Sequence, residues 1–164
     1  MTEITTELVK HLRDKTGVSV MQCKKALEEA GGDVDKAVAI LASKSAEIAL
    51  KKGDRTFGAG VIASYIHNTG NVGAMVELLC ETDFVAKNEE FQTLARDIAM
   101  QVSATNPTHL KAEDPGAGEA GEGVLLSQSF IKNPEVTINN LIQSAVQKFG
   151  EKIELSRFIR FSIS

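Results

Sequence analysis

The sequence has few of the residues that build metal centres, disulfide frameworks or thiol-dependent sites. Of its 164 residues, only Cys23 and Cys80 are cysteines, and only three are histidines. The two cysteines lie far apart, and neither has a second ligand at metal-binding spacing, so the sequence supports neither a zinc site nor a disulfide framework. We expect both cysteines to be small buried apolar groups and the protein to hold no metal.

Long apolar runs are also missing. The longest are far shorter than the roughly 20 residues that a membrane-spanning helix requires, so we expect no membrane insertion. Acidic residues precede the first apolar run, which is not the pattern of a signal peptide. The expected location is therefore the compartment of synthesis, either the cytoplasm or the matrix of an organelle.

Positive charge is scarce in the middle of the chain. The net charge is −4, and residues 77–123 hold ten acidic side chains against three basic ones, whereas residues 1–55 hold nine acidic and ten basic ones. A nucleic-acid surface spread over the whole molecule is excluded by this balance, so no stable nucleic-acid partner is expected.

Catalytic and nucleotide-binding motifs are not recognisable. The histidines are isolated in sequence, and no serine lies in a G-x-S-x-G frame. The glycines at 116, 118 and 121 spell G-x-G-x-x-G, but Pro115 and two acids precede them where a strand is required. We therefore expect neither covalent chemistry nor a cofactor.

What the sequence does contain begins with a bundle of three short helices, predicted for residues 1–52. Thr5 or Thr6 caps the first helix and Gly17 ends it, Ser19 opens a capping box, and Asp33 caps the third helix. The apolar positions recur at helical spacing but are rich in alanine, which predicts a thin core. Bundles of this size commonly serve as docking modules.

Val20 and Met21 stand beside the turn at Gly17. They either form an exposed apolar lip or only close the bundle, and the pattern favours neither interpretation. A polar joint at residues 51–54 then separates the bundle from the rest of the chain.

Residues 53–164 are predicted to form an α+β core domain. Alternation from Val61 and the turn at 68–71 predict a hairpin whose second strand is 72–80, and the tail 153–163 is predicted to join it as a third antiparallel strand. Helices are predicted from residue 89 and from residue 138, and we expect the sheet to be covered at least partly on both faces. Residues 124–131 look extended up to a break at Asn133-Pro134, and 111–123 is predicted to be an acidic, glycine-rich loop.

Phe84 is the residue that fits neither neighbouring pattern. It lies between the strand 72–80 and the helix that begins at 89. The possible caps Thr82 and Asp83 precede it, and the cap Asn88 follows it. One interpretation presents Phe84 to a partner on a stiff connection, because rigid exposed aromatics are common anchors in interfaces. The other tucks Phe84 into its own core.

Three stretches of the sequence resemble the elongation factor Ts family. They are residues 12–27 (LRDKTGVSVMQCKKAL), 81–87 (ETDFVAK) and 157–161 (RFIRF). The resemblance implies a guanine-nucleotide exchange factor that binds elongation factor Tu, in its GDP-bound and nucleotide-free states, and acts without covalent chemistry. It also implies that the bundle is a ubiquitin-associated-like docking module.

The resemblance also assigns roles to residues. Leu12, Val20 and Met21 match the docking region, and the segment formed by Thr82, Asp83, Phe84 and Val85 matches the part that disturbs the Mg²⁺ and phosphate site of elongation factor Tu.

The chain departs from the family in having only a glycine-rich loop where members carry a longer helical segment or a second core. Single-core members act as homodimers, so a homodimer is one expectation. The alternative function is a module unrelated to translation that binds a helix or a ubiquitin-like partner.

Overall fold

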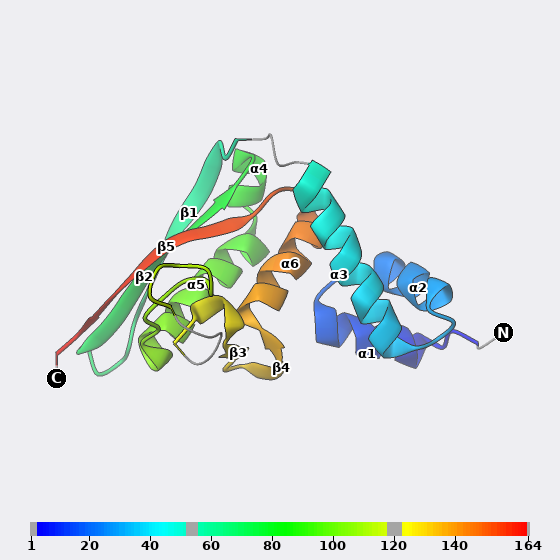
Figure 1. Ribbon diagram of the computed structural model, residues 1–164, viewed down its shortest axis with the longest axis horizontal. Coiled ribbons are helices and arrows are strands. Elements are labelled where there is room, and N and C mark those ends of the chain that lie inside the picture. Colours follow the sequence, from blue (N-terminus) through cyan, green and yellow to red (C-terminus); the bar gives the residue numbers. More distant parts are fainter. Residues whose placement is uncertain (1–2, 52–55, 118–122, 164) are drawn as a thin grey trace. The chain divides into compact units, whose positions relative to one another are not determined.

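The computed structural model describes residues 3–51, 56–117 and 123–163, and the elements follow one another as drawn in Figure 1. They form two compact units, one of Met1–Arg55 with Asn140–Lys152 and one of Thr56–Asn139 with Ile153–Ser164. Helices at the N-terminus followed by a small antiparallel sheet confirm the predicted α+β class. Each unit is described by itself below.

The first unit begins with the three predicted helices, α1 (Thr6–Thr16), α2 (Val20–Glu29) and α3 (Val34–Lys51). Thr5 caps α1, and Gly17 ends it in the left-handed region with a φ of 70°. The hydroxyl of Ser19 accepts a hydrogen bond from the backbone N–H of Gln22, and Asp33 accepts one from the N–H of Lys36. The predicted caps are therefore confirmed, because each depends only on neighbouring residues.

The core of this bundle is thin, as the alanine-rich pattern predicted. Its members come from all three helices and the turn after α1: Val9, Leu12, Val18, Cys23, Ala26, Leu27, Ala37 and Leu41. Cys23 is buried as expected, and desolvation raises the pKa of its thiol, so the reactive thiolate is disfavoured.

A fourth helix, α6 (Ile138–Phe149), contributes most of its length to the first unit. Its buried Gln147 accepts a hydrogen bond from the Ser45 hydroxyl at 3.2 Å, and the Gln147 carbonyl accepts one from the Gln22 amide at 3.5 Å. Buried polar groups are costly to leave unpaired, so these two bonds specify how α6 lies on the bundle. The first unit thus draws on residues far beyond position 52.

The second unit is built on a three-stranded antiparallel sheet of β1 (Ala59–Ile66), β2 (Val72–Cys80) and β5 (Glu154–Ser162), in the order β1-β2-β5. The predicted hairpin and the predicted third strand are both confirmed. Figure 1 shows α5 (Glu89–Thr105) running across one face of this sheet, and its residues Phe91, Ile98 and Val102 are fully buried there.

The other face of the sheet carries exposed apolar side chains, so the expectation of cover on both faces is wrong for the part of the chain that the structure describes. Ile62, Met75, Ile159 and Phe161 are between 46% and 69% exposed. Strands that are apolar on both sides led to that expectation, because sequence alone does not distinguish a covered face from an open one.

A β-bulge divides the last strand. Glu77 pairs with Arg157 but the next residue of β2, Leu78, pairs with Leu155, so Ser156 is the extra residue. An extra residue switches the alternation of faces. Leu155 is buried, whereas Ile159 and Phe161 are exposed, so the apolar side chains of the last strand lie on different faces of the sheet before and after the bulge.

A second, two-stranded sheet follows the turn η1 (Leu125–Ser127) and consists of β3 (Ser129–Phe130) and β4 (Asn133–Thr137). The prediction of an extended segment at 124–131 with a break at Asn133-Pro134 is wrong in part, because a helical turn precedes the strand β3 and Asn133 begins a further strand. Gln101 of α5 holds this sheet, since its side chain donates to the Ser129 carbonyl and accepts from the Ile131 N–H, each at 3.0 Å.

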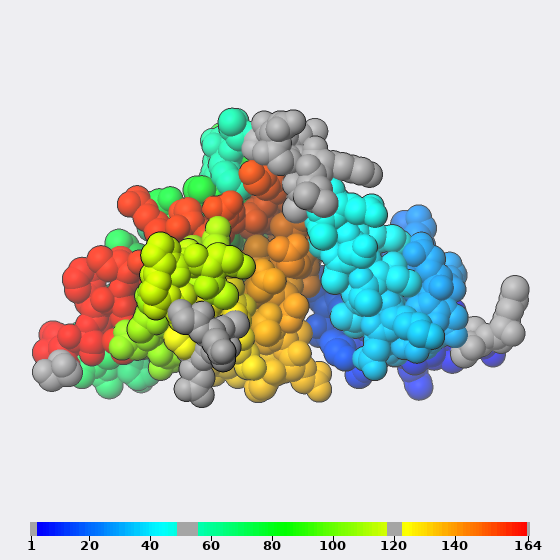
Figure 2. Space-filling model, viewed as in Figure 1, coloured from blue at the N-terminus to red at the C-terminus, as the bar shows by residue number. Residues whose placement is uncertain are grey.

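Residues 106–117 form turns on the surface of the second unit, where Figure 2 shows them in yellow-green. Residues 118–122 of the predicted glycine-rich loop and residues 52–54 of the predicted joint lie outside the described part of the chain. Among the described residues, no helix combines the length and the apolar character that a membrane crossing requires.

Candidate functional site

The segment that the sequence singled out forms a separate helical turn, α4 (Asp83–Ala86), between β2 and α5. Thr82 caps it, because its hydroxyl accepts a hydrogen bond from the backbone N–H of Val85 at 3.5 Å. Asn88 then caps α5 by accepting from the N–H of Glu90 at 2.9 Å. The chain leaves the central strand, makes one helical turn and enters the long helix after only Lys87 and Asn88.

Phe84 points away from the protein. Its side chain is 86% exposed, whereas the next residues, Val85 and Ala86, are only 5% and 7% exposed. Burial of Val85 and Ala86 against β1 and β2 anchors the turn and directs Phe84 outward. Thr82 and Asp83 are exposed beside it. The interpretation in which Phe84 fills its own core is wrong.

Two close contacts hold the start of the turn. The Cys80 thiol donates to the carbonyl of Thr82 at 3.3 Å. Gly58, just before β1, lies so close to the backbone of Glu81 that a Cβ at that position would approach the Glu81 carbonyl to 2.9 Å. A side chain at position 58 would therefore displace the segment that leads into Thr82.

The first unit has its own exposed apolar pair. Val20 and Met21 occupy the first turn of α2, immediately after its cap, and are 53% and 70% exposed. They form a lip on the surface, whereas Leu12 is fully buried beneath the bundle surface. Leu12 thus supports this region by packing, and a partner would meet Val20 and Met21. The interpretation in which the pair only closes the bundle does not agree with this exposure.

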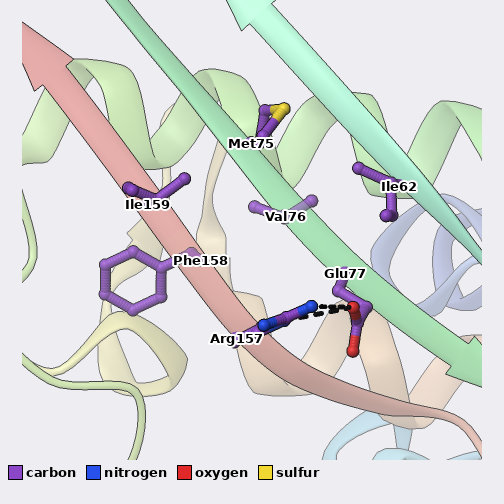
Figure 3. A pocket seen from close by; sticks show the side chains of 7 residues that line it. All are labelled: Ile62, Met75, Val76, Glu77, Arg157, Phe158 and Ile159. Atoms are coloured by element: carbon purple, nitrogen blue, oxygen red, sulfur yellow. Dashed lines mark hydrogen bonds and ion pairs between the residues drawn. The ribbon is translucent and has the colours of Figure 1, made fainter.

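The open face of the three-stranded sheet is a third candidate surface. It has a hollow of about 370 Å³, and Figure 3 shows the side chains that line it. The register places Ile62, Glu77 and Arg157 in one row across the strands, and Ser64, Met75 and Ile159 in the next. The hollow is therefore apolar, with one charged pair at its end.

The charges of Glu77 and Arg157 are paired with each other. Glu77 accepts hydrogen bonds from the Ser156 hydroxyl at 2.6 Å and from the Arg157 guanidinium at 3.1 Å. The hydrogen bond from Ser156 and then that from Arg157 lower the pKa of Glu77, so the carboxylate stays charged and paired at neutral pH. Sequence reasoning missed this face. Its signal was the lack of strict amphipathic alternation in the strands.

These surfaces have the features of protein-binding surfaces. They present exposed apolar anchors on rigid supports, which is the anatomy of interface hot spots. In the part of the chain that the structure describes, no group of three or more His, Cys, Asp and Glu side chains is placed to hold a metal ion.

Comparison with known proteins identifies the family. The model of a family described as "Elongation factor TS" matches residues 1–118 and 81–164. The chain is 40% identical over 193 residues to elongation factor Ts of Carboxydothermus hydrogenoformans, covering 98% of this chain and 89% of that protein. It is 44% identical over 192 residues to elongation factor Ts of Thermodesulfovibrio yellowstonii, covering 98% and 96% respectively. The chain belongs to the elongation factor Ts family.

Both alignments are longer than the 164 residues of this chain, so these relatives contain residues that this chain lacks. This agrees with the prediction of a shortened sequence. The predicted partner-binding residues 82–85 are brought together in one turn, with Val85 as its buried anchor, and Val20 and Met21 are neighbours in the other unit.

The exposure of Phe84 leads to a prediction about stability. Phe84→Ala should change the free energy of unfolding by less than ~0.5 kcal/mol, because it removes little buried surface. Ile98→Ala, in the fully buried face of α5, should lower it by ~2 to 5 kcal/mol. Urea denaturation of both variants measures the difference. Equal losses would mean that Phe84 contributes to the core.

Proposed function

We propose that this chain is a guanine-nucleotide exchange factor that binds elongation factor Tu and promotes release of GDP. Membership of the elongation factor Ts family supports this function. The observation that carries it is Phe84, an exposed aromatic on a capped turn with a buried anchor, inside the ETDFVAK segment. No covalent step is required, because a change in the partner's affinity for nucleotide can come from binding alone.

The proposed target of α4 is the Mg²⁺ and phosphate end of the nucleotide site. A GTPase holds these groups through backbone N–H groups, a lysine and a few oxygen ligands that must stay in register. A rigid aromatic side chain that inserts beneath these groups favours the state in which they no longer hold Mg²⁺ and the phosphates together. Phe84 supplies the volume, and the exposed Asp83 supplies a carboxylate beside it.

The proposed docking surface is the lip of Val20 and Met21. Lys24 and Lys25 follow one turn later on α2 and are exposed, so the lip is apolar with a basic border. Such a surface fits an apolar groove with acidic residues at its edge on the G domain of the partner. Leu12 belongs to the buried core of the same bundle.

Binding energy and nucleotide release are linked in both directions. If the factor weakens the hold on GDP by some ratio, nucleotide weakens the hold on the factor by the same ratio. The factor is therefore released when nucleotide rebinds, and one molecule serves many partners. The factor therefore binds elongation factor Tu in its GDP-bound state and in its nucleotide-free state.

The alternative function is a module that binds a helix or a ubiquitin-like protein through the bundle alone. This would use the lip but would leave Phe84 and its capped turn without a role. The exposed aromatic therefore favours the exchange function, and the two functions differ in whether α4 is needed.

The first functional prediction concerns GDP release. The purified chain should accelerate release of labelled GDP from elongation factor Tu by at least about tenfold, within the usual range of coupling between two sites. Incubated alone with GTP, it should produce no phosphate. An unchanged rate of GDP release would exclude the exchange function.

The second prediction separates docking from release. Val20→Ser with Met21→Ser should raise the half-saturating concentration of factor by at least about tenfold while the saturating rate stays near that of the unmodified chain. Asp83→Ala with Phe84→Ala should do the reverse, because contacts that favour only the loose state set the saturating rate. Titration of the factor in the GDP-release assay gives both quantities. The opposite result would reverse the two assigned roles.

We further propose that the open face of the sheet pairs with the same face of a second copy. The face is mostly apolar, and its Glu77–Arg157 pair is already neutralised within one copy. Two such faces can therefore stack without leaving an unpaired charge, in the way that sheets pack at about 10 Å separation in sandwiches.

The homodimer predicts a change in sedimentation. The unmodified chain should sediment as a dimer, and Ile159→Ser with Phe161→Ser should convert it to a monomer. Ile131→Ser is the control, because Ile131 is 48% exposed in the same unit but is not on this sheet. A monomeric unmodified chain at the highest soluble concentration would contradict the proposal.

A further inference from the structure

The position of Phe84 cannot come from its own packing. Its side chain is 86% exposed, so few contacts restrain the ring directly. The restraint must come from the backbone of α4, which has only four helical residues. Isolated helices of that length are not stable, because nucleation costs more than one turn of hydrogen bonds returns. The question is which contacts outside the turn keep it formed.

Backbone hydrogen bonds account for three of the carbonyls in this segment. The N–H groups of Ala86, Lys87 and Asn88 donate to the carbonyls of Thr82, Asp83 and Val85, at 3.2, 3.0 and 2.9 Å. The carbonyl of Ala86, the last helical residue, lies beyond these bonds. It accepts from the side-chain amide of Gln92 at 3.3 Å. Gln92 thus satisfies one of the orphan acceptors that every helix leaves at its end.

Gln92 belongs to the firmly packed part of the unit. It lies in the first turn of α5, where its backbone N–H donates to the carbonyl of Asn88 at 3.1 Å. The flanking residues Phe91 and Ala95 are fully buried. Its amide therefore ties the end of α4 to a helix that is fixed on the sheet, at the opposite end of the turn from the Cys80 and Gly58 contacts.

We propose that Gln92 is a positioning residue that fixes the direction of Phe84 for nucleotide release. This inference rests on the exchange function proposed above. Gln92 restrains the turn at its C-terminal end, and the Thr82 cap restrains it at the other. Without the amide, α4 stays capped and anchored by Val85, but its last carbonyl loses its partner and Phe84 samples more directions. The Phe84 ring can open the partner's nucleotide site only if it enters that site in the right direction.

The direct test uses Gln92→Met, which keeps an unbranched side chain of similar length and removes the donor. The saturating rate of GDP release should fall about fivefold, the order expected for one net hydrogen bond, while the half-saturating concentration changes by less than about twofold. Thr93→Val, at the exposed next position of α5, is the matched control and should release GDP at the unmodified rate.

A double-mutant cycle distinguishes positioning from general loosening. In a Phe84→Ala background, Gln92→Met should cause no further loss, because the residue through which it acts is absent. A fivefold loss that persists in that background would overturn the inference, as would a saturating rate for Gln92→Met equal to that of the unmodified chain.

A reporter within the chain tests the inference without the partner. The sequence contains no tryptophan, so Phe84→Trp introduces a single indole at the tip of α4. Time-resolved fluorescence anisotropy should show a lower residual anisotropy when Gln92→Met is added to Phe84→Trp, and no change when Thr93→Val is added. Equal values for all three would overturn the positioning role. Failure of the unmodified chain to accelerate GDP release would overturn the exchange function while leaving this result to stand.

Discussion

The burial of α5 against the three-stranded sheet is the interaction on which the second unit depends. Phe91, Ile98 and Val102 are removed from water on one side of this contact, and Val76 and Leu78 of the central strand on the other. Because α5 is fixed there, its cap at Asn88 is fixed too. The single turn before that cap then has little freedom, and the direction of Phe84 follows from packing that lies at a distance from it.

Both units separate the residues that hold a surface from the residues that form it. Val85 is buried directly beside the exposed Phe84, and Leu12 is buried in the bundle whose surface carries Val20 and Met21. The exposed members contribute little to folding, so the fold does not restrict which side chains occupy these positions. The buried members are constrained by the core, and it was the family resemblance that grouped Leu12 and Val85 with the predicted binding residues.

Most features set by neighbouring residues could be predicted from the sequence, and so could the joining of the third strand to the hairpin, whereas the detailed register of that distant pairing could not. The helix caps, the Gly17 stop and the hairpin depend on a few adjacent side chains and were predicted correctly. The bulge at Ser156 depends on a partner strand far along the chain. The strand at Asn133 pairs locally with β3, and it was missed because Pro134 was interpreted as a break. For the candidate site, the pattern located the turn, but the direction of Phe84 required knowing that Val85 finds a buried place.

The position of β5 in the sheet has a consequence for the order of folding. β2 lies in the centre, yet 79 positions separate Glu77 from the Ser156 that contacts it. Closing so long a loop is entropically costly, so the local hairpin of β1 and β2 can form early while β5 adds late. Until then β2 has one unpaired edge, and during synthesis this edge stays unpaired until residues 154–162 have emerged. A nascent chain of this kind is most exposed to wrong pairing in that interval, with the apolar hairpin made and its third strand still to arrive.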